Sequence, residues 1–505
     1  MKKILILVLV FISMHLFSQT NTEVFLLDIT NTKDSIALVH LKNISNNAGY
    51  DNQPYFYDNN TVLFASSRNH QTDIKSYTIS TDENAWKTNT ASGSEYSPLK
   101  IPNKEAVSAI RLDKNGLQRL YRYDFTNETS QILLKDIKVG YHVWYNQNIL
   151  VSAVLVEDSM DLVISDLEKN TNQTVHKNVG RSLHNIPNSN LIGFISVENN
   201  TTTIKSLNPI TGDIKIIKSL PILITDICWL SENKILIPDD KIIAQFNALD
   251  DSISILHQFQ ENEINGISRM AISPDGKHLA LVSEESPVIL IQKQSLAFNN
   301  KDLERFASYY SDDIIVQNFP NDTLYQGKSK LISDYKDFFS KNPEASAEVL
   351  KRIHKGNIVI DEERIIINGK EHHRAVLYEI RNGQIVNKTF IQDKEKLPEA
   401  EAIIQKQLEA FNAKNMDAFV KTFDSEVEAY DFPNKIYVQG KTQLQTVFSD
   451  FFAQTPDLHC DITNRIIIGN VVIDEEYLTV NGDNFNAIVI YEIENGKISK
   501  MTTIR

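Results

Sequence analysis

Cysteine and excess positive charge are scarce in this sequence. Only two of its 505 residues are cysteines, Cys228 and Cys460, and we expect them to lie in different domains. A scaffold held together by disulfides is therefore excluded. Acidic residues number 65 and basic residues 51, which gives a net charge of −14 without a dense basic cluster. This balance excludes nucleic acid and anionic lipid as partners, because affinity for phosphate groups comes from clustered Lys and Arg.

Short motifs that carry known chemistry are also missing. The sequence has no zinc-protease motif, no paired CxxC motif, no phosphate-binding or dinucleotide-binding glycine loop and no nucleophile elbow. We therefore expect no cofactor and no metal ion, and the choice between an enzyme and a binding protein stays open at this point.

A pronounced apolar run stands at the N-terminus. Lys2 and Lys3 precede the apolar residues 4–12, and small or polar residues follow around Ser18. This order predicts a secretory signal peptide over residues 1–19 and an exported protein, periplasmic or secreted, with no membrane attachment after cleavage. The alternative is a membrane anchor that is never cleaved. No later run is long and apolar enough to cross a bilayer.

The residues from 266 to 300 predict a boundary between two kinds of domain. Alternating apolar residues on both sides of the turn at residues 273–276 (SPDG) indicate a β-hairpin. After Ser286 as N-cap and Pro287 as first helical residue, the apolar residues recur at helical spacing. We expect a β domain before this point and α+β domains after it.

Residues 21–284 consist of short alternating runs separated by turn residues, and similar segments recur along them. Successive marker residues in these segments lie 44, 47, 42, 42 and 42 positions apart, at Asp51, Glu95, His142, His184, Asp226 and Ser268. A period in the low forties is typical of a four-stranded propeller blade, so six markers predict six blades. The last blade has room for only two strands, and the strands before Asp51 are expected to complete it.

The repeat resembles that of the TolB-like family of six-bladed propellers. The resemblance lies in residues 51–54 (DNQP), 62–68 (VLFASSR), 72–74 (TDI) and 273–280 (SPDGKHLA). It implies the fold over residues 20–284 and a tendency to bind a protein or peptide partner, but no reaction.

Polar residues at the blade starts are expected to surround one mouth of the propeller channel. They are Asp51, Glu95, His142, His184, Asp226 and Arg269. One interpretation is a ligand or metal site, because several of these residue types coordinate cations. The other is that they hydrogen-bond to neighbouring blades and stabilise the ring.

Residues 285–505 contain a tandem duplication. Shifting the chain by 113 residues aligns residues 319–321 (FPN) with 432–434, residues 361–363 (DEE) with 474–476, and residues 378–380 (YEI) with 491–493. Roughly four positions in ten are identical over a hundred, so one domain occurs twice, over 285–394 and 395–505.

Each copy reads as three helices and a run of strands. In the second copy the helices are expected at residues 400–412, 416–423 and 441–452, followed by strands with turns at residues 469–470, 481–482 and 495–496. An antiparallel sheet curved around the first helix would form a cone with a pocket inside. The expected fold is therefore multidomain: an all-β six-bladed propeller followed by two α+β cones.

Both copies resemble the SnoaL-like group of the nuclear transport factor 2-like superfamily. The resemblance lies in residues 411–415 (FNAKN), 451–458 (FFAQTPDL) and 491–498 (YEIENGKI). It implies the cone fold, and it includes ketosteroid isomerase and polyketide cyclases as well as domains that only bind.

Alignment with ketosteroid isomerase places Asp431 at the position of the general base. Gln407 stands at the position of the oxyanion-stabilising tyrosine and Ile490 at that of the protonated acid, while Asn318 replaces the base in the first copy. Loss of both donors makes that isomerisation improbable. The alternative for Asp431 is a structural cap of the turn that follows it.

Two hypotheses follow. In the first, the chain is an exported binding protein whose cones hold a small apolar ligand or pack against each other. In the second, it is an isomerase- or cyclase-type enzyme with Asp431 as base. The residues expected to contact a ligand or substrate are Gln407, Tyr430, Tyr437, His459 and Ile490. Isolated residues such as His459 and Cys460 are alternatively packing residues.

Overall fold

A computed structural model gives the structure of residues 21–31, 36–47, 49–69, 71–125, 129–198, 201–220, 222–392 and 397–505. The predicted signal peptide lies outside these ranges. The chain forms two compact units, and the division falls at Glu284, except that residues 259–265 belong to the second unit. None of the helices in the described ranges is long and apolar enough to span a membrane.

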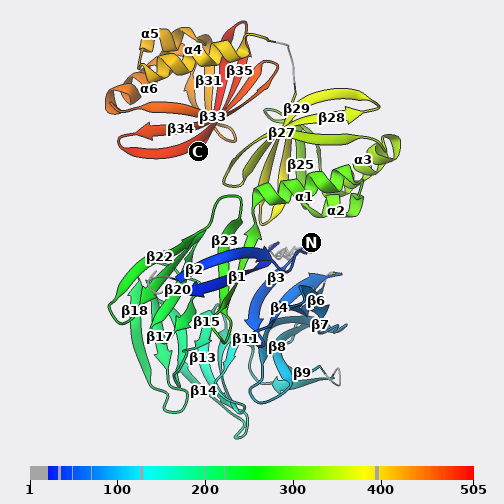
Figure 1. Ribbon diagram of the computed structural model, residues 1–505, viewed down its shortest axis with the longest axis vertical. Coiled ribbons are helices and arrows are strands. Elements are labelled where there is room, and N and C mark those ends of the chain that lie inside the picture. The colour runs from blue at the N-terminus through cyan, green and yellow to red at the C-terminus, as the bar shows by residue number, and fades with distance from the viewer. Residues whose placement is uncertain are drawn as a thin grey trace, which may run out of the picture. The chain divides into compact units, whose positions relative to one another are not determined.

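The described part of the first unit contains six four-stranded sheets, called the propeller below (Figure 1). Five of them are formed by consecutive strands, and neighbouring strands pair antiparallel. Their strands are β3 (Asp51–Phe56), β4 (Thr61–Arg68), β5 (Gln71–Thr78) and β6 (Glu83–Trp86); β7 (Gly93–Lys100), β8 (Ala106–Asp113), β9 (Gln118–Asp124) and β10 (Thr129–Leu134); β11 (Val139–Trp144), β12 (Ile149–Val156), β13 (Ser159–Asp166) and β14 (Thr171–His176); β15 (Val179–Asn185), β16 (Ile192–Glu198), β17 (Thr201–Leu207) and β18 (Ile214–Leu220); and β19 (Cys228–Ser231), β20 (Lys234–Asp239), β21 (Ile242–Asn247) and β22 (Ser252–Gln258).

The sixth sheet joins the beginning of the propeller sequence to its end. β1 (Glu23–Asn31) pairs with both β2 (Ile36–Asn43) and β24 (His278–Glu285), and β24 adjoins β23 (Ile264–Ile272). The two N-terminal strands therefore complete the last sheet, as the strand count predicted.

Burial within the sheets follows strand order. The second strands β4, β8, β12 and β16 each bury five consecutive residues, which means that both of their faces are packed. By contrast, the fourth strands β6, β10, β14 and β22 each begin with four exposed residues. Five of the six marker residues lie on first strands, and Asp226 lies just before β19. The cavity described below is lined mainly by the first strands β3, β7, β11, β15 and β23, together with Asp226.

The second unit contains two cones of identical element order. The first consists of α1 (Pro287–Asn299), α2 (Leu303–Ser308), β25 (Tyr310–Asn318), β26 (Asp322–Gln326), α3 (Lys328–Lys341), β27 (Ser346–Lys355), β28 (Ile358–Ile367), β29 (Lys370–Arg381) and β30 (Gln384–Ile391). The second consists of α4 (Ala400–Asn412), α5 (Met416–Lys421), β31 (Phe423–Asp431), β32 (Lys435–Gln439), α6 (Gly440–Gln454), β33 (His459–Ile468), β34 (Val471–Val480), β35 (Asp483–Glu494) and β36 (Lys497–Ile504). Ser286 is the N-cap residue of α1 and Pro287 its first residue, as expected.

The sheets of the cones are mixed, which corrects the expected antiparallel sheet. β31 pairs in parallel with β36, and β25 pairs in parallel with β30, while the other pairs are antiparallel. The parallel pair forms because helix α6, between β32 and β33, carries the chain to the far edge of the sheet, and the following strands return until β36 lies alongside β31.

The two cones pack sheet against sheet through one apolar cluster. Ten of its members occupy equivalent positions in the two copies: Ile353, Ile360, Ala375, Leu377 and Ile391 in the first cone, and Ile466, Ile473, Ile488, Ile490 and Ile504 in the second. The polar contacts at its edge are reciprocal as well. Lys351 donates to the carbonyl of Arg465 at 2.7 Å, and Asn464 donates to the carbonyl of Arg352 at 2.9 Å. The pair thus has the character of a symmetric dimer interface.

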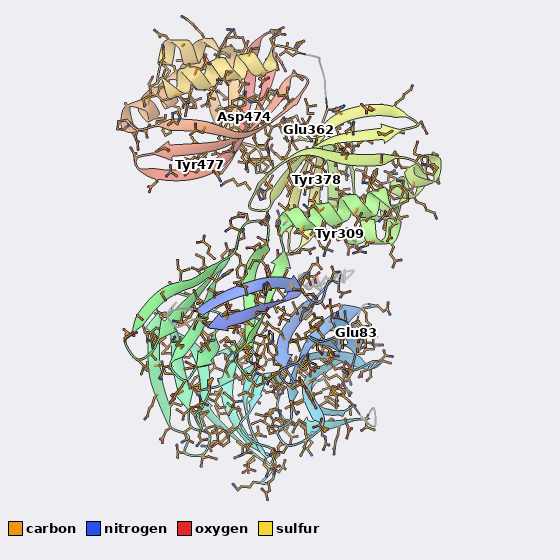
Figure 2. The ribbon with its side chains drawn as sticks, in the orientation of Figure 1. Glu83, Tyr309, Glu362, Tyr378, Asp474 and Tyr477 are labelled. Atoms are coloured by element: carbon orange, nitrogen blue, oxygen red, sulfur yellow. The ribbon has the colours of Figure 1, made fainter. Side chains whose placement is uncertain are left out.

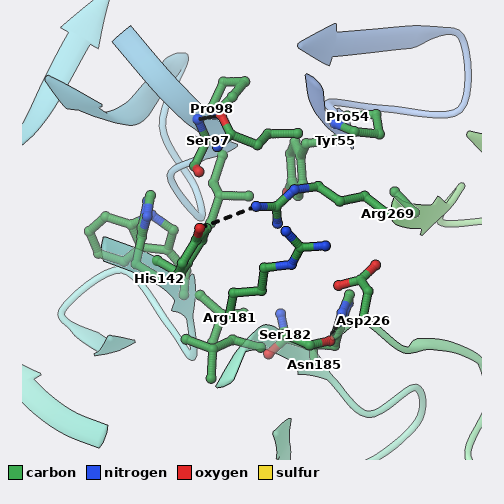
Figure 3. Close-up of a pocket in the computed structure, with 18 of the residues that line it drawn as sticks. Pro54, Tyr55, Ser97, Pro98, His142, Arg181, Ser182, Asn185, Asp226 and Arg269 are labelled. Atoms are coloured by element: carbon green, nitrogen blue, oxygen red, sulfur yellow. Dashed lines mark hydrogen bonds between the residues drawn. The ribbon is translucent and has the colours of Figure 1, made fainter. Parts of the chain in front are cut away.

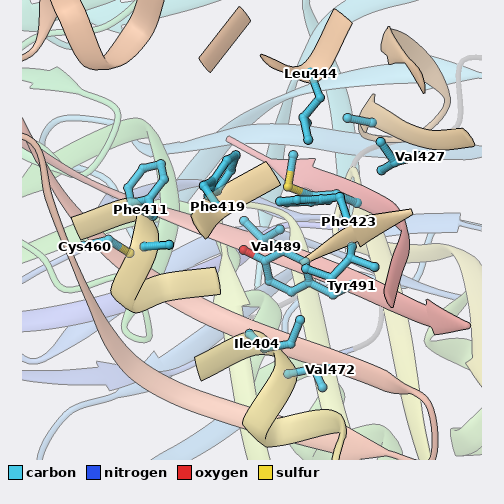
Figure 4. Close-up of a cluster of buried hydrophobic side chains, with 14 of the residues drawn as sticks. Ile404, Phe411, Phe419, Phe423, Val427, Leu444, Cys460, Val472, Val489 and Tyr491 are labelled. Carbon is cyan, nitrogen blue, oxygen red and sulfur yellow. The ribbon is translucent and has the colours of Figure 1, made fainter. Parts of the chain in front are cut away.

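The opposite face of the second cone's sheet packs against its helices. Phe452 on α6 forms edge-to-face ring contacts with Phe411 on α4 and with Phe419 on α5. These rings share one apolar cluster with Val489 and Tyr491 of the sheet, and Figure 4 shows Phe411 and Phe419 with these two residues. Along β34, Asp474 is buried on this face, whereas Tyr477 is 40% exposed on the other (Figure 2).

Candidate functional site

The second cone encloses a cavity of about 420 Å³ between its helices and its sheet. Most of its wall is apolar and aromatic, and a few polar side chains converge on it. The polar or titratable residues in the wall are Gln407, Tyr437, Cys460, Glu476, Tyr491, Thr503 and Arg505. A largely apolar cavity with a small polar set is the usual form of a small-molecule site.

Glu476 is the buried carboxylic acid of this cavity. The hydroxyl of Tyr491 donates to its Oε1 at 3.0 Å, and the Cys460 thiol also hydrogen-bonds to it. Burial raises the pKa of Glu476 to about 7, and the nearby Asp474 carboxylate adds to the shift. Burial also raises the pKa of the Cys460 thiol, so this thiol stays neutral and is a poor nucleophile.

The alternation of β34 places Glu476 in the cavity. Asp474, Glu476 and Leu478 point to the helix face, and Glu476 lies opposite Ala487 on β35. The small side chain of Ala487 leaves open space beside the carboxyl group.

Asp474 has a different role from Glu476. Arg465 donates to both of its carboxylate oxygens, at 2.6 and 2.7 Å. Arg352 and Asp361 form the same pair at the equivalent position of the first cone. Because both cones contain this Arg–Asp pair, we assign it a structural role in the fold that the cones share and not a role in the cavity of the second cone.

The first cone fills the equivalent space with two cations. Arg374 stands where the second cone has Ala487, and its guanidinium donates to Glu363, the counterpart of Glu476, at 2.8 and 3.0 Å. Lys388 stands where the second cone has Met501, donates to the Tyr335 hydroxyl at 2.9 Å and lies over surrounding aromatic rings. The first cone retains a smaller cavity of about 280 Å³.

Gln407 also differs from its counterpart. In the first cone, Gln294 donates to the Tyr310 hydroxyl at 3.0 Å. The second cone has Phe423 in place of this tyrosine, so the Gln407 amide lacks that partner and is available to a ligand in the cavity.

The structure brings together two of the six residues predicted for the cone site. Gln407 and Tyr437 line the cavity. Asp431 is not part of the wall; its carboxylate lies 3.5 Å from Arg505, which does line the cavity. The Tyr430 hydroxyl donates to Glu428 at 2.6 Å, and His459 is exposed beside Asp461.

Ile490 requires a correction. It is 1% exposed and packs in the cluster between the cones, while its neighbours Val489 and Tyr491 face the cavity. The alignment that placed it toward a ligand is therefore off by one position on a strand whose side chains alternate. Sequence reasoning missed Glu476 as a site residue, although the repeated DEE triplet at 474–476 contained it. The signal was that Asp474 and Glu476 lie two positions apart on a strand with many apolar residues, so both carboxyl groups point to the same buried face.

The propeller contains a second cavity, of about 230 Å³, where the first strands of several sheets converge. Of the six residues predicted for the channel, His142, His184, Asp226 and Arg269 line it. Burial lowers the pKa of His142 to about 3 and lowers that of His184, so both imidazoles are neutral. Arg181 and Tyr141 also line the cavity and were missed, although each lies in a recurring entry segment.

The remaining two predicted channel residues lie away from this cavity. Asp51 is fully buried, and burial raises its pKa well above the usual range. Glu95 accepts hydrogen bonds from Thr88 and Tyr123, and burial raises its pKa to about 7. Glu95 thus hydrogen-bonds within its own sheet and to the segment before it, whereas neither carboxylate oxygen of Asp51 has a hydrogen-bond partner among the described residues. Within the described ranges, no group of three or more His, Cys, Asp and Glu is arranged to hold a metal ion.

The family model of the SnoaL-like domain matches residues 291–388 and again residues 404–501. No curated protein matches the chain. A solved cystatin-fold protein from Novosphingobium aromaticivorans is similar at 20% identity over 21% of this chain and 97% of its own, with a TM-score of 0.21.

Two further solved structures are similar to separate parts of the chain. A protein assigned as a ketosteroid isomerase from Kribbella flavida shows 16% identity over 21% of this chain and 77% of its own, with a TM-score of 0.20. A protein assigned as TolB from Agrobacterium tumefaciens shows 13% identity over 52% of this chain and 98% of its own, with a TM-score of 0.42. These likenesses concern the fold and do not bear on ligand or reaction.

Proposed function

Since residues 291–388 and 404–501 are two tandem SnoaL-like domains, we propose that the second of them binds a small, largely apolar molecule bearing one polar group. The observation that carries this proposal is the difference between the copies. The second cone has Ala487 and Met501 where the first has Arg374 and Lys388, and this exchange leaves an open cavity beside Glu476. The first cone then serves mainly as the packing partner of the second.

The chemistry of the wall defines the ligand class. Aromatic rings of Phe411, Phe448 and Phe451 supply apolar contact, and hydrogen bonds come from Gln407 and from Glu476, whose carboxyl group is protonated below its pKa of about 7. A hydroxyl, carbonyl or amide group on the ligand would satisfy them. A carboxylate would be repelled by Glu476 once that group ionises above pH 7.

Dye binding to the full-length protein tests the proposal. Nile red, a neutral dye that fluoresces in apolar surroundings, is expected to bind, and Ala487→Arg is expected to weaken binding by narrowing the cavity as Arg374 does in the first cone. Ala453→Arg, at an exposed position of α6, is the matched control and should bind normally. Unchanged binding by Ala487→Arg would contradict the proposal.

A second candidate function is proton transfer next to a carbonyl group. It is favoured by the pKa of Glu476 at about 7, a value that suits a general base or acid at neutral pH, and by the adjacent Tyr491 hydroxyl. In this version Glu476 replaces Asp431 as the base. It would remove a proton from the carbon beside the carbonyl and return one to the resulting enolate.

Exchange of hydrogen for deuterium in cyclohexanone measures this activity. In D₂O, NMR should show that the protein accelerates loss of the α-hydrogens, that Glu476→Gln abolishes the acceleration and that Asp431→Asn retains it. A rate equal to that of buffer would exclude this activity on simple ketones, and loss of activity in Asp431→Asn alone would return the base to Asp431.

Export remains part of the proposal. It is supported by the order of charged, apolar and small residues over positions 1–19. Mass spectrometry of the protein from its native host should find a mature chain that begins near residue 20.

A further inference from the structure

The propeller cavity contains two arginines whose positive charges face each other. Arg181 comes from β15 and Arg269 from β23, and Figure 3 shows their guanidinium groups side by side in the cavity. Burial lowers the pKa of Arg181, and the positive charge of Arg269 lowers it further. Two cations held this close repel each other unless an anion lies between them.

Neither guanidinium forms an ion pair with a carboxylate among the described residues. Arg181 donates to the carbonyls of Ser268 and Thr225, at 2.5 and 3.3 Å, and to the Thr225 hydroxyl. Arg269 donates to the Tyr141 hydroxyl at 3.3 Å, and its Nε is buried without a hydrogen-bond partner. A buried donor without a partner costs stability, and the Arg269 side chain to which it belongs lines the cavity.

The other charges that line the cavity do not neutralise both arginines. Asp226 is the acidic residue of the wall, and its Oδ2 accepts from the backbone N–H of Met270 at 2.8 Å. Lys100 also lines the cavity, and its ammonium group lies 4.0 Å from the carboxylate of Glu105, a residue that is not part of the wall. His142 and His184 are neutral because burial lowers the pKa of each. With Asp226 counted against one arginine, one positive charge remains in excess.

We propose that this cavity binds the carboxylate of an organic anion between Arg181 and Arg269. A planar carboxylate accepts two parallel hydrogen bonds from a guanidinium, and one such group balances the excess charge. Pro54, Pro98, Leu183 and the ring of Tyr55 supply apolar walls, and the volume of about 230 Å³ suits a body the size of one amino-acid side chain. The carboxylate belongs either to a small organic acid or to the C-terminus of a peptide.

Calorimetric titration of the full-length protein at low salt tests this assignment. Benzoate and N-acetylphenylalanine are expected to bind, whereas N-acetylphenylalaninamide, which lacks the carboxylate, is not. The peptide Ala-Ala-Phe distinguishes the two sources. Tighter binding of Ala-Ala-Phe than of benzoate would indicate a peptide terminus, and tighter binding of benzoate would indicate a small acid.

Variants connect the binding to the arginine pair. Arg269→Gln should weaken benzoate binding by roughly tenfold to a hundredfold, the usual effect of losing a hydrogen bond to a charged group. Arg269→Lys, which keeps the charge but not the planar fork, should weaken it less. Arg122→Gln, on β9 outside the cavity wall, is the control, and thermal unfolding of each variant confirms that it is folded.

Three results would overturn the assignment. One is equal affinity for N-acetylphenylalanine and its amide, because the carboxylate would then contribute nothing. Another is unchanged benzoate binding by folded Arg269→Gln and Arg269→Lys. The third is inorganic phosphate binding as tightly as benzoate, which would indicate a general anion site.

Discussion

Glu476 shows how one small neighbour changes the character of a buried acid. In the first cone Glu363 accepts from Arg374 and from the Tyr378 hydroxyl, so its charge has a partner. In the second cone the arginine is replaced by Ala487, and the tyrosine contact remains. The carboxyl group therefore loses its cation and retains its burial, which favours the protonated form.

The raised pKa of Glu476 predicts a pH-dependent stability. Its folded-state pKa of about 7 lies above the ordinary 4.5. Between these pH values the folded protein keeps a proton that the unfolded chain releases, so the contribution of Glu476 to the free energy of unfolding falls as pH rises. The loss across this window is on the order of 3 kcal/mol.

Urea unfolding of wild type and Glu476→Gln at pH 5 and pH 8 measures this effect. The neutral glutamine lacks this titration, so the variant should gain stability relative to wild type as the pH rises. Glu475→Gln, on the other face of β34, is the control and should keep a constant difference from wild type. A constant difference for Glu476→Gln as well would mean that its pKa is not raised.

At the scale of the element, β35 separates two environments. Val489 and Tyr491 face the cavity, and Ile490 between them faces the other cone. All seven residues from Ala487 to Ile493 are buried. One strand therefore contributes to the candidate ligand site and to the contact between the copies at the same time.

Substitutions on the two faces of β35 should have different effects. Ile490→Ala is expected to reduce stability by about 2–5 kcal/mol through a cavity in the interface and to leave Nile red affinity unchanged. Leu377→Ala, at the equivalent position of the first cone, should cost a similar amount. Val489→Ala enlarges the ligand cavity and should change dye affinity. Altered dye affinity in a folded Ile490→Ala variant would contradict this division.

The sequence predicts elements better than it predicts the faces they present. Helix α4 was expected at residues 400–412 and lies there, because helical spacing and turn residues are local signals. The face of β35 was not predictable, since both of its faces are apolar and buried. The parallel pairing of β31 with β36 was not predictable either, because these strands are far apart in sequence. A register shift between Glu492 and Ile493 also changes which residues of β35 lie opposite those of β36.

The candidate site was predicted only in part for the same reason. Gln407 was found from a residue-by-residue resemblance and Tyr437 as a polar residue expected near it, and both line the cavity. Glu476 gains its properties from Ala487, Tyr491 and Cys460, which approach it from neighbouring strands. Arg181 and Arg269 are 88 positions apart in sequence and meet only through the arrangement of the sheets.

At the scale of the whole molecule, the two compact units predict two calorimetric transitions. Residues 259–265 and 285–505 form one cooperative unit because the cones share an apolar cluster, and the propeller forms the other. In scanning calorimetry, Ile490→Ala should lower the temperature of one transition and leave the other in place. A single transition that shifts as a whole would contradict the independence of the units.

The reciprocal interface between the cones has a consequence for how the copies can differ. In a homodimer of separate chains, a mutation such as alanine to arginine would appear in both subunits, and both cavities would close together. Covalent fusion holds the halves at a high effective concentration and lets each be encoded separately. The two cones thus pair like the subunits of a heterodimer, although they belong to one chain. The second cone can change its cavity while the first keeps the apolar interface between them.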